Sequence, residues 1–513
     1  MQRRDFLKAA AGTTLAALPP EPLPARPQPA LGAGLPTPPP AEPRKWNILV
    51  VVSDTTRVAY LGPYGNTRVK TPTLDQLAKE SALFERAHPE CLPTIPTRRT
   101  LHSGRRAFPF RDYKPIPWDN VVQPGWQPMD SGQDVVAEAL ARAGYHNGFV
   151  SDVPHYFVPG NNFTRGFHQW DFVRGNAEDR YRSTATVDMK KLEQRYGSAL
   201  PRAAQHVANL GGFEPDEMAF ATPRTFRSAI QFLEENKSNP KPFYLYVDTF
   251  HPHETWEAPA KYYKLYADPK YTGKTFLQFP YNTLSDVENK QPELAKVLGD
   301  EKVLANVKAH YSGLITMMDH WFGQLLAKLK ELGKDRDTLV IYLSDHGTNF
   351  ADNLEKVMGK PSGAMYPGTM DVPLLVRHPD GKGAGKRFRE FVYSLDVPAT
   401  VCAVAGTAPK EGVEGQNLLA LLEGGPFKKR EYLTCRYSNC VWYTDDKNWY
   451  FSDVHSDNAR LFDLEADKPF EQTVAKKAPE RVKRAWQHIL ADAGGKLPVY
   501  PLKPTDRVKG PSI

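Results

Sequence analysis

The stretch Asn47-Ile-Leu-Val-Val-Val-Ser53 decides the fold class of this chain, and Asp54 follows it directly. A continuous apolar run rich in β-branched residues is typical of a strand buried on both faces of a parallel sheet. Similar runs recur at 148–150, 243–247, 339–343 and 372–376. Segments with helical periodicity alternate with these runs, at 73–81, 134–143, 223–235 and 306–332. This alternation predicts an α/β fold, a doubly wound and mainly parallel sheet flanked by helices.

Polar residues that directly follow the predicted strands are candidates for a functional site, because open α/β sheets bind ligands beyond the carboxyl ends of their strands. Asp54 follows the first run, His251 and His253 follow the run at 243–247, and Asp345 and His346 follow the run at 339–343. Aspartate and histidine together bind divalent cations, and oxygen ligands favour Ca²⁺, Mg²⁺ or Mn²⁺. A single aspartate after a strand is more often a cap or turn residue, so the convergence of several on one edge carries the prediction.

The composition describes a large folded chain of 513 residues, 41% hydrophobic and 24% charged. The formal net charge of +7 is small for this length, and no dense basic run is interleaved with aromatic residues, which argues against a nucleic-acid partner. No stretch reaches the roughly 18 apolar residues that a transmembrane span requires. Four cysteines do not make a disulfide framework; Cys435 and Cys440 either pair across a hairpin or remain free thiols.

The N-terminus has the features of an export signal. Met1-Gln-Arg-Arg-Asp-Phe-Leu-Lys8 precedes a weakly apolar segment, and residues 1–18 together resemble a twin-arginine signal. This resemblance implies a bacterial periplasmic or secreted protein with the Tat export machinery as a partner; the alternative is an ordinary basic N-terminus on a cytosolic chain. Residues 19–44 are rich in proline and poor in large apolar residues, which predicts an extended linker.

A series of short motifs follows along the chain in a fixed order. They are the 47–54 run, Leu61-Gly-Pro-Tyr-Gly65, Thr71-Pro-Thr-Leu-Asp75, Pro96-Thr-Arg98, Ser103-Gly-Arg105, His251-Pro-His253, Ser344-Asp-His-Gly347, Gly359-Lys360 and Val372-Pro-Leu-Leu-Val-Arg377. In this order they resemble the sulfatase family of the alkaline phosphatase superfamily, from about Asn47 to about Glu471. The resemblance implies a catalytic α/β domain over 45–411 and a smaller C-terminal α+β subdomain over 412–513. Short strands near 431–435, 440–443 and 449–451 and a closing helix at 480–493 are expected in that subdomain.

The nucleophile motif departs from the family pattern. The family carries Cys-x-Pro-x-Arg or Ser-x-Pro-x-Arg, whose first residue is oxidised to formylglycine, whereas this chain has Thr94-Ile-Pro-Thr-Arg98. Threonine carries a methyl group on Cβ and cannot be oxidised to an aldehyde, so no formylglycine is expected and Thr94 would act as an unmodified alcohol. Pro96 suits the first turn of a helix, which would place the Thr94 hydroxyl at a helix N-terminus that favours anions.

The resemblance also implies the metal ligands. Asp54, Asp345 and His346 match ligands of the family, and they are expected to hold one divalent cation, Ca²⁺, Mg²⁺ or Mn²⁺, that Thr94, substrate or water completes. The second aspartate of the usual Asp-Asp pair is replaced by Thr55. The cage is therefore expected to contain fewer carboxylates than usual.

Three further residues receive catalytic roles through the resemblance. Arg98 matches the arginine that steadies the nucleophile, and His253 and Lys360 match residues that contact the ester oxygens or protonate the leaving group. Asp152 stands where the family has a lysine, so part of the usual positive charge is absent. Asp248, His251 and His253 are the candidates for a second metal site, although their spacing does not match the usual pattern.

Three functions follow as hypotheses. The family resemblance indicates an exported, metal-dependent sulfuric ester hydrolase that acts on a small-molecule or glycan ester. Thr94 instead favours a phosphodiester or phosphonate monoester, because a threonine adduct must be released by attack of water rather than by elimination. The third hypothesis is an inactive homologue that binds anionic glycans, since Thr55 and Asp152 replace expected functional residues.

Overall fold

The computed structural model describes residues 45–114, 123–176, 179–197, 200–278, 281, 288–289 and 292–501. The predicted export signal and linker, residues 1–44, lie outside the described residues. From Lys45 onward the chain forms one compact unit. None of the helices in the described part combines the length and the apolar character needed to cross a membrane.

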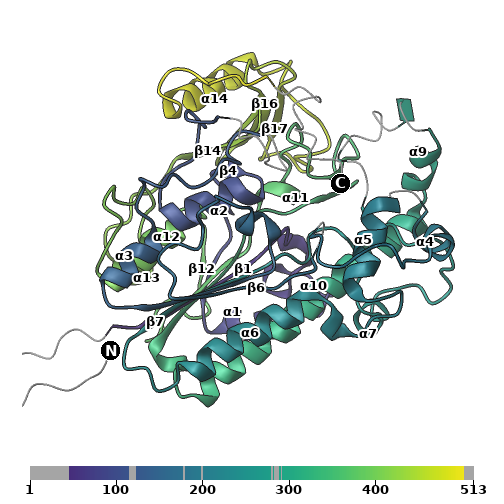
Figure 1. Ribbon diagram of the computed structural model, residues 1–513. Helices are drawn as coiled ribbons and strands as arrows, with labels where there is room; N and C mark the ends of the chain where they lie inside the picture. The colour runs from purple at the N-terminus through teal and green to yellow at the C-terminus, as the bar shows by residue number, and fades with distance from the viewer. Residues whose placement is uncertain are drawn as a thin grey trace, which may run out of the picture. The chain divides into compact units, whose positions relative to one another are not determined.

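An eight-stranded sheet forms the centre of the molecule (Figure 1), in the order β12-β2-β11-β8-β1-β7-β5-β6. Its strands are β1 (Asn47–Ser53), β2 (Ala82–Phe84), β5 (His146–Ser151), β6 (Gln169–Phe172), β7 (Phe243–Thr249), β8 (Thr338–Ser344), β11 (Leu374–Arg377) and β12 (Arg387–Phe388). The central strand β1 pairs in parallel with both β7 and β8. Only β11 runs antiparallel to its neighbours β8 and β2. The predicted α/β fold with a mainly parallel sheet is thus confirmed.

Side chains from the two faces of β1 enter two separate hydrophobic cores. Ile48, Val50 and Val52 pack in one core, and Leu49 and Val51 pack in the other. The helices on the first side are α2 (Thr94–Ser103), α3 (Val136–Arg142) and α12 (Asp396–Ala405). Those on the second side are α1 (Pro72–Lys79), α6 (Ala221–Glu235) and α10 (Glu301–Glu331), as Figure 1 shows. Burial on both faces explains why the strand sequence is continuously apolar.

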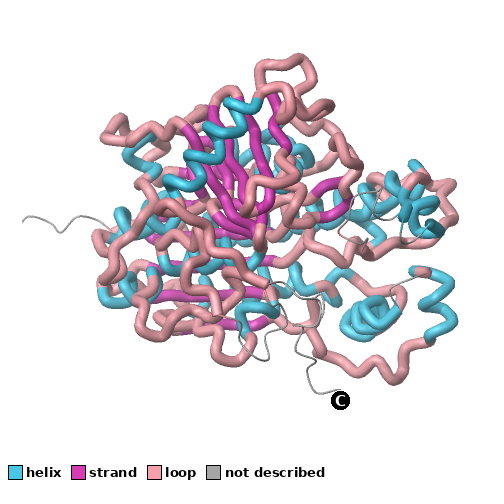
Figure 2. The backbone as a smooth tube through the Cα atoms, turned by 90° about the horizontal axis from the view of Figure 1, so that it is seen from above, coloured by secondary structure: helices cyan, strands magenta, loops and turns pink. Residues whose placement is uncertain are grey.

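A second sheet of five strands has the order β17-β16-β15-β14-β4. Its members are β4 (Cys91–Leu92), β14 (Tyr432–Tyr437), β15 (Cys440–Asp445), β16 (Asn448–Asp453) and β17 (Arg460–Asp463), and α14 (Pro479–Asp492) packs against it. The strands lie centrally in Figure 2, with helices and loops around them. Strand β4 ends two residues before Thr94, with Pro93 between them, and pairs in parallel with β14. All four cysteines are free thiols.

The remaining elements are short or peripheral. The strands are β3 (Ala87–His88), β9 (Asn349–Phe350), β10 (Met358–Gly359) and β13 (Val392–Tyr393). The helices are α4 (Met189–Tyr196), α5 (Leu200–Leu210), α7 (Ala260–Tyr263), α9 (Pro292–Leu298), α11 (Pro367–Met370) and α13 (Leu418–Leu422). Helices α4 and α5 were not among the predicted segments; they pack against each other in a small core of their own.

Candidate active site

The predicted site residues come together at the carboxyl ends of the central strands. Asp54 follows β1, and Asp345 and His346 follow β8, which is the neighbour of β1 in the sheet. Thr94 is the first residue of α2, and Arg98 lies one turn further along the same helix. His253 lies in the loop after β7, and Lys360 follows β10. All seven side chains belong to residues that are buried.

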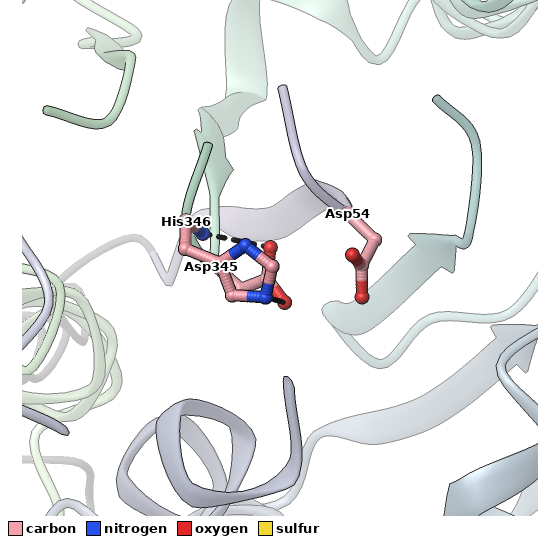
Figure 3. Close-up of side chains that lie close together, drawn as sticks. All are labelled: Asp54, Asp345 and His346. Atoms are coloured by element: carbon pink, nitrogen blue, oxygen red, sulfur yellow. Dashed lines mark hydrogen bonds and ion pairs between the residues drawn. The ribbon is translucent and has the colours of Figure 1, made fainter. Parts of the chain in front are cut away.

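Asp54, Asp345 and His346 form the candidate metal centre. One ligand atom of each residue lies within 4.8 Å of the other two, and Figure 3 shows Asp54 facing the other two side chains across a gap. Oδ2 of Asp54 is buried and receives no hydrogen bond from the described residues, although Arg98 Nη1 lies 3.0 Å away. Burial, followed by the charge of Asp345, raises the pKa of Asp54 well above its usual range. Two carboxylates and an imidazole that converge in this way fit a divalent cation.

The hydrogen bonds of His346 identify which ring nitrogen is available. Nδ1 lies 3.0 Å from the carbonyl oxygen of Gly347, so this nitrogen carries the proton and Nε2 holds the lone pair. Nε2 lies 3.4 Å from a carboxylate oxygen of Asp345 and 3.5 Å from the hydroxyl of Thr94. Burial lowers the pKa of His346 to about 4, so the ring is neutral at pH 7, as a metal ligand must be.

Arg98 connects helix α2 to three strand ends. Its Nε and Nη2 donate to the two oxygens of Asp248, each at 2.8 Å. Its Nη1 contacts Asp345 and Asp54 and donates to the carbonyl oxygen of Thr94 at 3.3 Å. A fully buried guanidinium can exist here only because carboxylates surround it. These contacts fix the first turn of α2, and with it Thr94, against the metal centre.

Lys360 and Thr55 link the metal centre to a fourth carboxylate, that of Glu254. The ammonium group of Lys360 donates to Glu254 at 2.8 Å and to the hydroxyl of Thr55 at 3.2 Å. The Thr55 hydroxyl donates in turn to Asp54 at 2.5 Å, and the Thr55 N–H donates to Asp345 at 3.0 Å. Lys360 is only 3% exposed, so it is no surface lysine.

The residues considered for a second metal site are already engaged elsewhere. Both oxygens of Asp248 bond to Arg98, and one also accepts from Tyr156 at 2.6 Å. Nδ1 of His251 lies 2.8 Å from the hydroxyl of Thr222. Within the described ranges, Asp54, Asp345 and His346 converge as metal ligands would, and no second such group is present. A second metal at Asp248 therefore has no support.

Asp152, which replaces the expected lysine, has a structural position. Its carboxylate accepts from the Phe250 N–H at 2.7 Å and from the Asn176 amide at 3.2 Å, and so connects β5 to the loop after β7. Burial raises its pKa to about 7. The neighbouring His155 packs against the rings of Trp126 and Phe250.

Sequence reasoning did not identify Glu254 or the linking role of Thr55. Glu254 is fully buried between Lys360 and His253, whose Nδ1 lies 3.0 Å from its carboxylate. A buried glutamate in a loop has no distinctive spacing, although its position directly after the His-Pro-His motif was a usable signal. Thr55 was noted only as a missing aspartate.

Comparison with known proteins identifies the family. The family model described as "Sulfatase" matches residues 46–407 of this chain. The chain belongs to the sulfatase family.

Individual relatives have low sequence identity to this chain but align over most of its length. An arylsulfatase of Clostridium perfringens (strain 13 / Type A) is 26% identical over 449 residues, which cover 82% of this chain and 89% of the relative. The multifunctional alkaline phosphatase superfamily protein PehA of Trinickia caryophylli is 25% identical, covering 78% and 82%. Among solved structures, a phosphonate monoester hydrolase of Agrobacterium radiobacter superposes with a TM-score of 0.66 at 22% identity and shares the fold over 88% of this chain and 95% of that one.

Proposed function

We propose that this sulfatase-family protein is a metal-dependent hydrolase of sulfate esters in which unmodified Thr94 is the nucleophile. The observation that carries the proposal is the position of the Thr94 hydroxyl. It lies at the first residue of a helix and 3.5 Å from Nε2 of His346, at the edge of the metal centre. A helix N-terminus stabilises the negative charge of an ester in front of it. The similarity to an arylsulfatase supports the substrate class.

Asp54, Asp345 and His346 would hold the cation in this proposal. When bound, a divalent cation supplies positive charge that lowers the pKa of a nearby hydroxyl and stabilises charge on ester oxygens. The Thr94 oxygen forms a bond to sulfur and releases its proton to solvent, while the bond from sulfur to the leaving oxygen breaks. Water then attacks sulfur, frees sulfate and returns a proton to Thr94. Arg98 holds Thr94 in place through both steps.

The hydrogen bonds of His253 favour Lys360 as the donor that protonates the leaving alcohol. Nδ1 of His253 lies 2.7 Å from the carbonyl oxygen of Glu254 and 3.0 Å from its carboxylate, so Nδ1 carries a proton. Burial, followed by the charge of Lys360, lowers the pKa of His253, which leaves Nε2 without a proton near neutral pH. The Lys360 ammonium donates to Glu254 and to Thr55, and its Nζ lies 5.3 Å from the centroid of the Tyr281 ring. We assign its third N–H to the substrate.

Phosphonate monoesters and phosphodiesters form a second candidate substrate class. Thr94 itself favours this class, because a threonine adduct cannot eliminate sulfate as a formylglycine hydrate does and depends on direct attack by water. The fold shared with a phosphonate monoester hydrolase is consistent with it. The third hypothesis, an inactive binder of anionic glycans, predicts no turnover of any ester.

Assays with matched aryl esters test the proposal. Purified protein is incubated with 4-nitrophenyl sulfate, 4-nitrophenyl phenylphosphonate and bis(4-nitrophenyl) phosphate, with and without added Mn²⁺ or Ca²⁺. We expect cation-dependent turnover that Thr94→Ala abolishes and Thr100→Ala preserves, because the Thr100 hydroxyl donates to the carbonyl oxygen of Thr97 within α2. Turnover that survives in Thr94→Ala would remove Thr94 from the mechanism, and no turnover at all would leave the glycan-binding hypothesis.

We also propose export through the twin-arginine route to the periplasm or the exterior. Arg3 and Arg4 are followed by a weakly apolar segment up to residue 18, as in a twin-arginine signal. Residues 19–44 contain too few large apolar side chains to form a hydrophobic core. Replacing both arginines with lysine is expected to leave the protein in the cytoplasm of a Tat-competent bacterium. Fractionation with antibody detection gives the result, and unchanged export of the double variant would contradict the route.

A further inference from the structure

Glu254 is a buried acid in the part of the site that should receive an anion. Its Oε2 lies 2.8 Å from the Lys360 ammonium and 3.0 Å from the His253 ring, the two groups expected to face the ester oxygens. Its Oε1 is buried and has no hydrogen bond of normal geometry from the described residues, and the Tyr281 hydroxyl interacts with the same carboxylate. The residue is 0% exposed. A full negative charge thus lies beside the two groups that are expected to bind the anion.

The charges around this site are closely balanced. Two side chains, Arg98 and Lys360, are cations, and both are bonded to carboxylates. The carboxylates are those of Asp54, Asp248, Asp345 and Glu254. One divalent cation held by Asp54, Asp345 and His346 would bring these six ionised side chains to neutrality, and Arg202 is a further cation whose charge acts on the nearby Tyr281 and His155. In a buried site with little water, an added negative charge interacts strongly with the charges already present.

We propose that Glu254 is a specificity-determining residue that restricts the site to esters with a single negative charge. The inference rests on the proposed function. A sulfate monoester, a phosphonate monoester and a phosphodiester each bring one charge, which the helix N-terminus and the third N–H of Lys360 can stabilise. A phosphate monoester brings two charges at pH 8, and the second would lie beside the Glu254 carboxylate. Repulsion between close like charges in a buried site disfavours that substrate.

The role of Glu254 differs from simple support of Lys360. If Glu254 only held Lys360 in position, its loss would lower kcat/KM and binding affinity by the same factor for every ester. If it sets the charge of the site, its neutral isostere must change the preference between substrates of equal shape and unequal charge. The ratio between two such substrates therefore separates the two roles.

Phenyl sulfate and phenyl phosphate are suitable probes, because their tetrahedral groups have nearly the same size but carry one and two charges at pH 8. Wild type, Glu254→Gln and Glu90→Gln are compared with Mn²⁺ present. Glu90 is the matched control, a buried glutamate beside Arg106 that accepts from the Ala107 and Phe108 N–H groups. Two quantities are measured: kcat/KM for each ester, and the binding affinity of each ester for the same chains carrying Thr94→Ala.

We expect Glu254→Gln to raise the phosphate-to-sulfate ratio of kcat/KM by about tenfold or more, and the binding ratio similarly, as removal of a nearby buried charge should. Glu90→Gln should leave both ratios unchanged. A folded Glu254→Gln variant whose ratios stay within about twofold of wild type overturns the inference, whatever its overall rate. If no chain turns over either ester, the proposed function fails, and the binding ratio alone still decides the role of Glu254.

Discussion

Thr55 adopts a backbone conformation that threonine rarely accepts. Its φ of 62° lies in the left-handed region, where a β-branched side chain costs about 1–3 kcal/mol. The contacts of the residue offset this strain, because its N–H and hydroxyl bond to Asp345 and Asp54 and its carbonyl oxygen accepts from Tyr311 at 2.7 Å. The strained turn thereby fixes two of the three metal-centre residues relative to each other.

Thr55→Asp should strengthen the metal centre. Aspartate tolerates a positive φ better than threonine and adds a third carboxylate beside Asp54 and Asp345. We expect the affinity for Mn²⁺ to rise about tenfold, measured by calorimetry on the metal-free protein. Thr55→Asn has nearly the same shape without the charge and is the control. An equal rise in Mn²⁺ affinity in the two variants, or no rise in Thr55→Asp, would contradict a metal site beside residue 55.

The meeting of Asp54, Asp345 and His346 could be predicted from the sequence, because each follows a long apolar strand and the strands are neighbours in one sheet. Asp54 and Asp345 end neighbouring parallel strands, and parallel strands bring their carboxyl ends to one edge. Glu254 could not be found in this way, because its importance depends on Lys360 and His253 reaching the same place from separate loops. That meeting is a tertiary property, and the local sequence signals only that Glu254 follows the His-Pro-His motif.

Helix α2 carries Thr94, Arg98 and His102 at a spacing of four. They therefore share one face, which is directed at the sheet. His102 packs among aromatic rings, including those of Phe149 and Tyr246, and its Nε2 has no hydrogen-bond partner among the described residues. Burial, followed by the charge of Arg98, lowers the pKa of His102 to about 3. The helix is thus held in place by a histidine that must remain neutral.

This gives a prediction for the pH dependence of stability. As the pH falls below about 6.5 the unfolded imidazole takes up a proton while the folded ring does not, so the contribution of His102 is present above pH 6.5 and is lost towards pH 3. Between pH 8 and pH 5, His102→Phe should lose about 2 kcal/mol less free energy of unfolding than wild type. Urea unfolding at both pH values measures the difference. Equal losses in the two proteins would show that His102 is protonated in the fold.

The predictability of each element followed its length and burial. The long apolar runs predicted the bounds of β1, β7 and β8 to within two residues. Helix α10 begins at Glu301, five residues earlier than predicted. Strand β4, two residues long, was not predicted, because it exists through pairing with β14 far along the chain. The antiparallel direction of β11 also depends on its partners and cannot be read from its own residues.

At the scale of the whole molecule, the C-terminal sheet pairs with the strand that leads into α2 and Thr94. Cys91 and Leu92 of β4 pair with Arg436 and Tyr437 of β14, one residue before the turn into α2. The Arg436 guanidinium donates to the carbonyl oxygen of Pro109 at 2.6 Å. The second sheet therefore includes residues from both predicted domains, and the boundary at residue 412 stays a prediction.

A chain ending at residue 411 should fail to fold. Such a chain lacks β14–β17, which exposes the core that Leu92 and Met365 share with Trp442 and Phe451. The lost free energy of unfolding should exceed the roughly 5–15 kcal/mol that stabilises a typical domain. We expect residues 45–411 to aggregate on gel filtration and to lack turnover, whereas residues 45–501 should remain soluble and active. A soluble, active 45–411 chain would show that the C-terminal sheet is dispensable.

The central claim is that unmodified Thr94 forms the covalent bond to the ester. The most direct measurement is mass spectrometry of the peptide that contains Thr94, from protein quenched in acid during turnover of the best ester found. The account predicts an unmodified threonine in resting protein and, in quenched protein, a mass increase equal to the transferred group at Thr94. Active protein whose transferred group is found on another residue, or never on the chain, would contradict it.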